Sequence, residues 1–259
     1  MSSEQLVAEL RKIENEHVAR AQKFDKEGKS FEAGQEHQNA LMANKAADSY
    51  ERGSTLAPPL EVLYRMQKYD AKPEAVATRT DLDKRQDLVR GEDGKALVLW
   101  RGVTGAEFAD QFKGMGEMGD THYAGRGIYG NGSYAASPAP GAVRPKGAFE
   151  EAKSYAGWGD EGIDRRLTAF GIRRDANIVE FSGSDWRERS DKFGAWKNET
   201  MDRAEREIGR TYSDVGEAAA ALGIHAYRVP QGRDEDFWVI LNRGALVVAG
   251  DPQIEDFTK

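Results

Sequence analysis

The run Lys95-Ala96-Leu97-Val98-Leu99-Trp100-Arg101-Gly102 marks the point where the chain changes from helical to β character. It follows the turn dipeptide Asp93-Gly94, and its apolar residues predict a short strand over 95–100. Arg101 breaks the apolar pattern at the end of this strand, where a planar guanidinium can bind phosphate or ribose oxygens. Gly102 would let a ligand approach the backbone closely. A structural salt bridge made by Arg101 is the competing interpretation.

Upstream of this run, residues 1–90 have a helical pattern. Apolar residues recur at helical spacing over 6–24 and again over 31–52, with charged residues between them. We therefore expect a helical N-terminal region over 1–90. Such amphipathic stripes are typical of core faces, so a cap packed on the following domain is favoured over a partner-binding hairpin.

Local signals place the ends of these helices. Ser2 and Gln5 have the spacing of a capping box, and Ser30 is expected to be the N-cap of the second helix. A short third helix is predicted over 60–69, after a proline pair. The highly charged segment 80–90 is expected to form another helix.

Residues 91–259 form the predicted second domain. Short apolar runs alternate there with two helical patterns, over 185–208 and 214–222. Many short strands with interspersed helices favour an α+β domain. Besides 95–100, the predicted strands are 167–172, 177–181, 225–229, 237–241 and 245–249.

The composition excludes several classes of function. The chain has 259 residues, a formal net charge of −7 and no cysteine, so disulfides, thiolate zinc sites and cysteine nucleophiles are excluded. The negative charge disfavours non-specific binding to nucleic acid without excluding a local basic patch. A metal site is not expected because the histidines lack metal-ligand spacing; they are His17, His37, His122 and His225.

No targeting or membrane segment is expected. The N-terminus lacks the basic and apolar regions of a signal peptide, and no apolar run approaches the ~20 residues of a membrane span. We expect a protein that acts in the cytoplasm or is delivered into a host cytoplasm. The oligomeric state is left open.

A glycine-rich stretch runs from Tyr123 to Ser137 and interleaves four glycines with aromatic residues. It lacks the preceding strand, following helix and distant acid of a Rossmann fingerprint, and prolines follow it instead. One interpretation is a strand entered through a glycine turn, with an aromatic ring beside a planar ligand. A glycine-rich surface hairpin is the equal alternative.

An acidic run, Gly232-Arg233-Asp234-Glu235-Asp236, precedes the predicted strand 237–241. Carboxylates at the mouth of a strand can lie in a cleft and act on a ribose hydroxyl. A solvated turn between strands is the commoner meaning of such a run.

Together these segments resemble the ADP-ribosyltransferase superfamily. Leu99-Trp100-Arg101-Gly102 is similar to the Leu-Trp-His-Gly segment of poly(ADP-ribose) polymerases, with the arginine of the arginine–serine–glutamate branch, which includes many bacterial toxins and phage-encoded enzymes. The run 130–136 resembles the polymerase Gly-Lys-Gly-Ile-Tyr-Phe-Ala strand, and 152–156 resembles the helix start that follows it. The resemblance covers roughly 96–249.

The resemblance implies a split two-sheet β core with flanking helices around an NAD cleft, and no metal. Gly102 would bind the nicotinamide amide, Tyr134 would lie against the nicotinamide ring, and Arg101 would contact ribose or phosphate. The implied set of cofactor-binding residues is Arg101, Gly102, Gly132, Ser133, Tyr134, Ser137 and Tyr155.

The family also uses a glutamate that holds the ribose 2′-hydroxyl and stabilises the oxocarbenium-like transition state. Here the residue at the expected place is Phe237, while Glu235 and Asp236 lie one or two positions earlier. The Glu-x-Glu and serine–threonine–serine motifs are absent. We expect Glu235 to be the catalytic carboxylate and Asp236 to be the second choice, with Arg101 as a further catalytic residue.

The implied activity is NAD-dependent mono-ADP-ribosyl transfer to a macromolecule, in the first place a protein. Three alternatives stay open. One is an inactive module of the same fold that binds NAD or ADP-ribose, the second is a structural or interaction protein of this fold, for instance from a phage, and the third is an NAD glycohydrolase. The residue two before the carboxylate, Arg233, indicates no particular acceptor.

Overall fold

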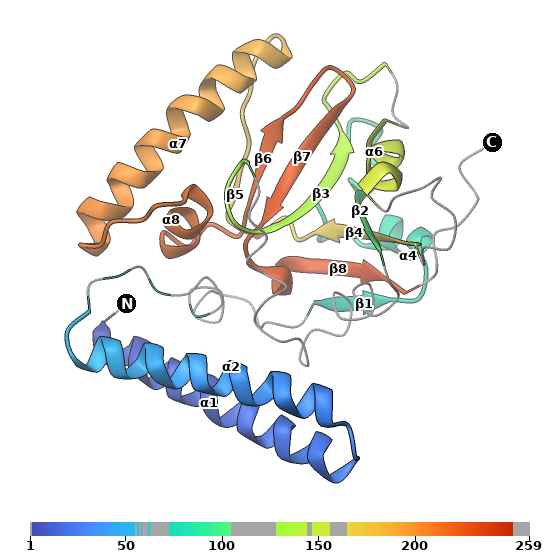
Figure 1. Cartoon of the computed structure of the whole chain (residues 1–259). Helices are drawn as coiled ribbons and strands as arrows, with labels where there is room; N and C mark the ends of the chain where they lie inside the picture. The colour runs from blue at the N-terminus through green and yellow to red at the C-terminus, as the bar shows by residue number, and fades with distance from the viewer. Residues whose placement is uncertain are drawn as a thin grey trace.

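The computed structural model describes residues 2–54, 56, 58, 62, 73–104, 128–143, 147–155 and 165–250. It has a mixed α+β fold in which N-terminal helices precede an eight-stranded mixed sheet with flanking helices (Figure 1). The α+β class expected from the sequence is confirmed. Within these described ranges, no helix is long and apolar enough to cross a membrane.

The first two helices, α1 (Ser3–Lys26) and α2 (Ser30–Glu51), form an antiparallel hairpin with its own apolar core. The Ser2–Gln5 capping box is present as predicted. The second cap was predicted wrongly: Lys29 is the N-cap of α2, with no side-chain hydrogen bond, and Ser30 is already helical. The buried hairpin core consists of Leu6, Leu10, Ile13, Ala43, Ala47, Tyr50 and Val62.

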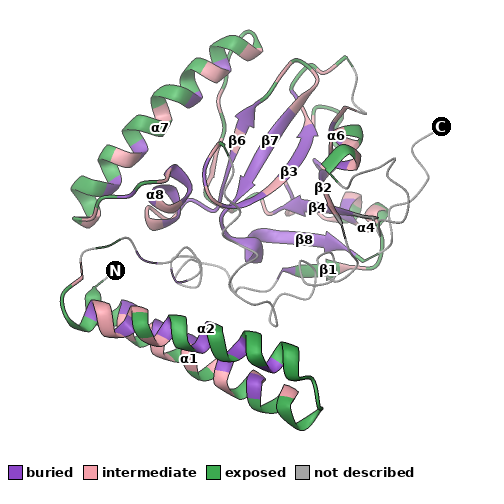
Figure 2. Ribbon diagram, viewed as in Figure 1, coloured by how far each residue is buried: buried purple, intermediate pink, exposed green. Residues whose placement is uncertain are grey.

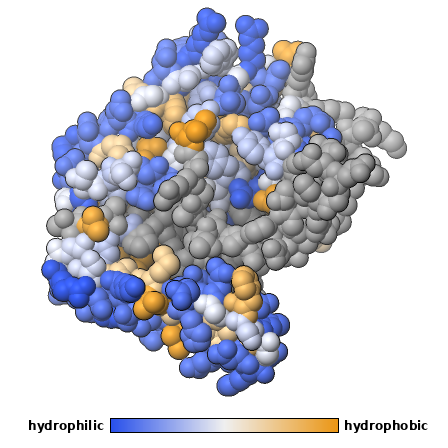
Figure 3. Space-filling model, in the orientation of Figure 1, coloured by the Kyte–Doolittle hydropathy of each residue, from blue (hydrophilic) through white to orange (hydrophobic). Residues whose placement is uncertain are grey.

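Some apolar side chains remain on the surface of this hairpin. Phe31 is 80% exposed and Met42 is 67% exposed. Figure 3 shows orange groups among the blue charged groups over the hairpin. Single exposed apolar residues are normal on a soluble domain.

The sheet has the strand order β1-β8-β4-β2-β3-β7-β6-β5. Only the β1–β8 and β5–β6 pairs are parallel among the described strands. The strands are β1 (Glu74–Val76), β2 (Leu99–Thr104), β3 (Ser133–Pro138), β4 (Arg165–Ile172), β5 (Ile178–Val179), β6 (Ala226–Pro230), β7 (Glu235–Ile240) and β8 (Leu246–Ala249).

The sheet is weakly joined at its middle. Between β2 and β3 the ladder consists of one residue pair, Trp100–Ala136, whereas β3 and β7 are paired over six residues. Figure 1 shows β3, β6 and β7 running steeply across the direction of β1 and β8. The sheet therefore consists of two differently oriented halves, β1-β8-β4-β2 and β3-β7-β6-β5.

The two faces of the sheet are buried against different partners. One face packs on the helices α4 (Arg79–Lys84), α6 (Gly147–Tyr155), α7 (Trp186–Ile208) and α8 (Val215–Ala221). The other face forms a core cluster from strands, their connections and the short 3-10 helix η2 (Arg243–Ala245), so the two halves pack on each other there. Figure 2 shows β6, β7 and β8 as mostly buried, whereas β1 at the edge of the sheet is mostly exposed. We call these the helix face and the inner face.

Several predicted elements are present with shifted bounds. The two later helices are confirmed as α7 and α8, capped by Asp185 and Asp214. The predicted strand over 95–100 is instead β2, which begins at Leu99, because Ala96 forms only an isolated bridge with Arg90. The helix predicted over 80–90 is the shorter α4, which ends before Leu88 pairs with Arg173.

Residues before position 91 also contribute to the sheet. Strand β1 pairs with β8 at its edge, and α4 contacts β4 and β8. The third helix predicted over 60–69 lies outside the described residues, apart from Val62. The N-terminal region therefore includes a separate hairpin and a segment that belongs to the sheet.

Candidate functional site

The start of β7 separates the two candidate carboxylates. Side chains alternate along a strand, so the neighbours Glu235 and Asp236 point to opposite faces of the sheet. Glu235 shares the helix face with Phe237, and Asp236 shares the inner face with Trp238.

Asp236 lies in a buried ion-pair network. Its side chain is completely buried, and its Oδ2 accepts hydrogen bonds from Arg189 Nη1 at 2.6 Å and Arg228 Nε at 2.8 Å. Arg228 also pairs with Glu180 at 2.9 Å and donates to the carbonyl of Pro138. This carboxylate ties β7 to α7 and β6, so it is engaged in structure and faces no open surface.

Glu235 has a different environment. It is half-buried at the edge of β7, and its Oε2 lies 2.8 Å from where a Cβ on Gly147 would be, at the first residue of α6. Burial raises the pKa of Glu235, and the nearby carboxylates of Glu151, Asp234 and Asp236 raise it further. Glu235 is therefore the accessible member of the pair, and it holds its proton to a higher pH than an ordinary glutamate.

Three aromatic rings lie on the same face as Glu235. The ring of the buried Phe237 is 6.0 Å from Tyr129 and 6.1 Å from Tyr155, measured between centroids. Tyr155, at the end of α6, is 64% exposed. The rings therefore form an apolar floor with one side open to solvent, which suits a planar ligand.

Tyr134 is fixed within this group by its hydroxyl. The Tyr134 Oη donates to the carbonyl of Gly130 at 2.6 Å and accepts from the backbone N–H of Tyr129 at 3.1 Å. Burial raises the pKa of Tyr134, and charges at Asp214, Tyr129 and Tyr155 add to the effect. Tyr134 therefore stays neutral and holds the turn that carries Tyr129.

Close packing explains the glycines of this turn. Gly130 has a φ of +119°, and a Cβ there would overlap the hydroxyl of Tyr227. A Cβ on Gly132 would lie 2.6 Å from Val239 Cγ1. Between them, the backbone N–H of Asn131 donates to Asp214, the N-cap of α8, at 2.7 Å. The turn thus enters β3 as one interpretation of the sequence predicted, and its glycines fit it against the protein's own core.

Arg101 bridges the weak join of the sheet. Its Nη1 donates to the carbonyl of Tyr134 on β3 at 2.7 Å, beside the single Trp100–Ala136 ladder pair. Burial lowers the pKa of Arg101 to about 10, so it stays charged at neutral pH. By strand alternation Arg101 shares the inner face with Leu99, whereas Tyr134 and Glu235 lie on the helix face. The adjacent Gly102 pairs with Leu167 of β4.

The two serines of the predicted site are buried on the inner face. Ser133 is 2% exposed, and its hydroxyl has no hydrogen-bond partner among the described residues. Ser137 is fully buried, accepts from the indole N–H of Trp238 at 2.9 Å and donates to the carbonyl of Pro138. Both serines therefore lie on the face of the sheet opposite to Tyr129, Tyr155 and Phe237.

The structure thus brings together Glu235, Tyr134 and Tyr155 but leaves Arg101, Asp236 and the serines on the inner face. Tyr129 was not among the residues predicted from the sequence, although it lies in the glycine-rich run. Phe237 was noted only as the residue at the position where the family has its catalytic glutamate. The segment 105–127, which includes the start of the glycine-rich stretch, lies outside the described residues, as does Ala156.

No cluster of three or more potential metal ligands occurs among the residues that the structure describes. No family model, curated protein or solved structure matches the chain.

Proposed function

We propose that the chain is an NAD-dependent mono-ADP-ribosyltransferase with Glu235 as its catalytic carboxylate. The observation that carries the proposal is the position of Glu235 at the start of β7. It is half-buried, has a raised pKa, and shares a face with the rings of Tyr129, Tyr155 and Phe237. Asp236, the other candidate, is neutralised by two arginines.

The strand arrangement also supports the proposal. The resemblance implies two β layers that separate around a ligand, and this sheet has two halves joined by one ladder pair. Its join lies beside Gly102 and Tyr134, the two residues that the resemblance assigns to nicotinamide. A ligand there would meet backbone groups of β2 that are not paired with β3.

In the proposed mechanism, Tyr134 and Tyr155 hold the nicotinamide ring between aromatic surfaces. The ionised Glu235 accepts a hydrogen bond from the ribose 2′-hydroxyl and stabilises the positive charge that develops as the glycosidic bond breaks. Nicotinamide leaves with the bonding electron pair. A nucleophile of the acceptor then attacks the anomeric carbon and releases its proton. Arg101 acts as a positioning residue that holds β3 against β2.

Incubation with NAD labelled in its adenosine part tests the proposal. The wild-type protein should release nicotinamide and transfer label to a protein in a cell lysate. Glu235→Gln should lower both by about 100- to 1000-fold, the usual cost of removing one transition-state contact. Glu150→Gln is the matched control, because Glu150 is an exposed carboxylate of α6 paired with Lys153.

The outcomes separate the related activities. Nicotinamide release without label transfer in any lysate would identify a glycohydrolase. Equal activity in the wild type and Glu235→Gln would exclude Glu235 as the catalytic group. No nicotinamide release at all would refute the proposal that the protein is an NAD-consuming enzyme.

A second candidate function is an NAD-binding module without turnover. It is favoured by Arg101, whose guanidinium is engaged with the backbone of β3 on the inner face instead of lying beside Glu235. Calorimetric titration with NAD distinguishes the two: heat of binding without nicotinamide release supports the module.

A further inference from the structure

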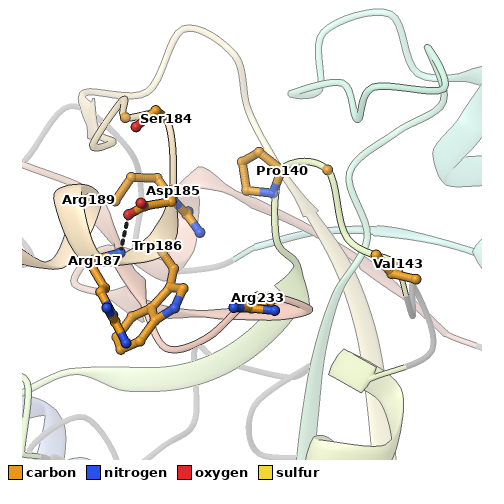
Figure 4. Close-up of a pocket in the computed structure, with 10 residues that line it drawn as sticks. Pro140, Val143, Ser184, Asp185, Trp186, Arg187, Arg189 and Arg233 are labelled. Atoms are coloured by element: carbon orange, nitrogen blue, oxygen red, sulfur yellow. Dashed lines mark hydrogen bonds between the residues drawn. The ribbon is translucent and has the colours of Figure 1, made fainter.

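A second, chemically different pocket lies at the N-terminus of α7. It is a cavity of about 390 Å³ between the start of this helix, the turn after β3 and the turn between β6 and β7 (Figure 4). Its volume falls at the lower end of the range for small-molecule sites. Three arginines line it: Arg187, Arg189 and Arg233.

Arg189 is the buried and fixed arginine of this pocket. It is 6% exposed, and its Nη1 is held by Asp236 at 2.6 Å. Its other guanidinium nitrogens have no hydrogen-bond partner among the described residues, and Figure 4 shows the side chain pointing into the pocket. A guanidinium held at one end presents donors in a fixed direction, at a low entropic cost of binding.

The other two arginines provide mobile charge at the rim. Arg187 is exposed and lies over the ring of Trp186, with 5.6 Å between its Cζ and the ring centroid. Arg233 is exposed on the β6–β7 turn and has no ion-pair partner among the described residues. Neither guanidinium is neutralised by a described carboxylate, so both can turn toward a ligand.

One acidic residue also lines the pocket. Asp185 is the N-cap of α7, and its Oδ1 accepts from the backbone N–H groups of Arg187 at 2.8 Å and Glu188 at 3.0 Å. The carboxylate of Asp185 is thus engaged by the backbone N–H groups of the first turn of α7. Three arginines and one aspartate therefore line the pocket, and because Asp236 already pairs with Arg189, the unpaired positive charge comes from Arg187 and Arg233 at the rim.

We propose that this pocket binds a phosphate group, either as the free ion or as a phosphate monoester. Guanidinium groups match phosphate oxygens with paired hydrogen bonds, and the two rim arginines add positive charge that attracts an anion. Gly183 and Gly141 also line the pocket. The proposal does not depend on the NAD site, because that site lies on the helix face beside α6.

Titration calorimetry with inorganic phosphate and with glycerol phosphate tests the site on the full chain at fixed ionic strength. Arg233→Gln and Arg187→Gln should each weaken phosphate binding about tenfold, the usual effect of one charge-assisted hydrogen bond. Arg203→Gln is the matched control: it removes an equal charge from an exposed arginine of α7 that pairs with Glu207 outside the pocket.

Arg189 needs a conservative variant because its removal would take away one of the two arginines that pair with the buried Asp236. Arg189→Lys keeps the charge but loses the planar fork, so it should fold, as judged by circular dichroism, and bind phosphate several-fold more weakly. Tighter binding of glycerol phosphate than of inorganic phosphate would identify the monoester as the preferred form, and the reverse would identify the free ion.

Two results would overturn the proposal. One is phosphate binding no stronger than that of chloride at the same ionic strength. The other is an equal loss of binding in Arg233→Gln and Arg203→Gln, since this would reflect net charge alone.

Discussion

At the start of β7, two adjacent carboxylates lie on opposite faces of the sheet and have opposite environments. On the inner face, Asp236 is fully buried and paired with Arg189 and Arg228. On the helix face, Glu235 is half-buried among other acidic groups, with no ion pair among the described contacts and a raised pKa. The contrast shows that the environment of a carboxylate can reverse within one residue of a strand: Asp236 is neutralised by arginines, whereas Glu235 lies among other acidic groups.

The largest expected effect comes from breaking the inner-face network. Asp236→Ala leaves two guanidinium groups without their shared carboxylate, so it should lower the free energy of unfolding by about 3–5 kcal/mol. Urea denaturation measures this loss. Glu235→Ala is the control on the opposite face and should cost less than about 1 kcal/mol. Equal losses in both variants would contradict the division between the faces.

The next effect concerns the turn that supports the helix face. Gly130→Ala places a methyl group against Tyr227 in a backbone with φ of +119°, so it should destabilise the protein by about 1–3 kcal/mol. Gly94→Ala is the matched control, because Gly94 also has a positive φ, +75°, with open space around it. Thermal unfolding should show a larger loss at position 130. A larger loss at position 94 would show that contact with Tyr227 is unimportant.

Removal of one hydroxyl gives a smaller effect. Tyr134→Phe deletes the bonds to Gly130 and Tyr129 and should cost about 1 kcal/mol. Tyr155→Phe removes the hydroxyl of a 64% exposed ring, so its stability should be close to that of the wild type. Chemical denaturation of both variants checks the comparison. A Tyr155→Phe variant that is as unstable as Tyr134→Phe would contradict the prediction.

The smallest effect is a pH dependence from Glu235. Because its pKa is raised in the folded protein, the folded state binds the proton more tightly than the unfolded state does. The stability that this provides is present below the usual value near 4.5 and is lost as pH rises through the raised pKa.

Glu235→Gln should remove this dependence of stability on pH. At pH values above the raised pKa of Glu235, the variant should be slightly more stable than the wild type. Melting temperatures of both proteins, measured from acidic to neutral pH, check the direction of this pH dependence. Glu150→Gln is the comparison, because it removes an exposed carboxylate of α6 that pairs with Lys153. A wild-type protein that gains stability relative to Glu235→Gln as pH rises would refute the assigned environment.

Local physical chemistry accounts for the elements that were predicted well from the sequence. The Ser2–Gln5 capping box and the apolar spacing of α1 act within one or two helical turns, so they can be seen in a short window. The α+β class and the strands β4 to β8 follow in the same way from apolar runs and turn residues.

The sequence alone predicted a buried strand over 237–241 with Glu235 and Asp236 just before it, and it left the choice between the two carboxylates open. In the structure the strand starts two residues earlier, so both carboxylates lie within β7. Only the tertiary structure decided it. The arginines that neutralise Asp236 come from α7, 47 residues away, and from β6. Strand alternation assigns the two carboxylates to opposite faces, but which face receives the arginines depends on how α7 packs. Such long-range contacts cannot be read from local spacing, because they depend on the packing of the whole domain.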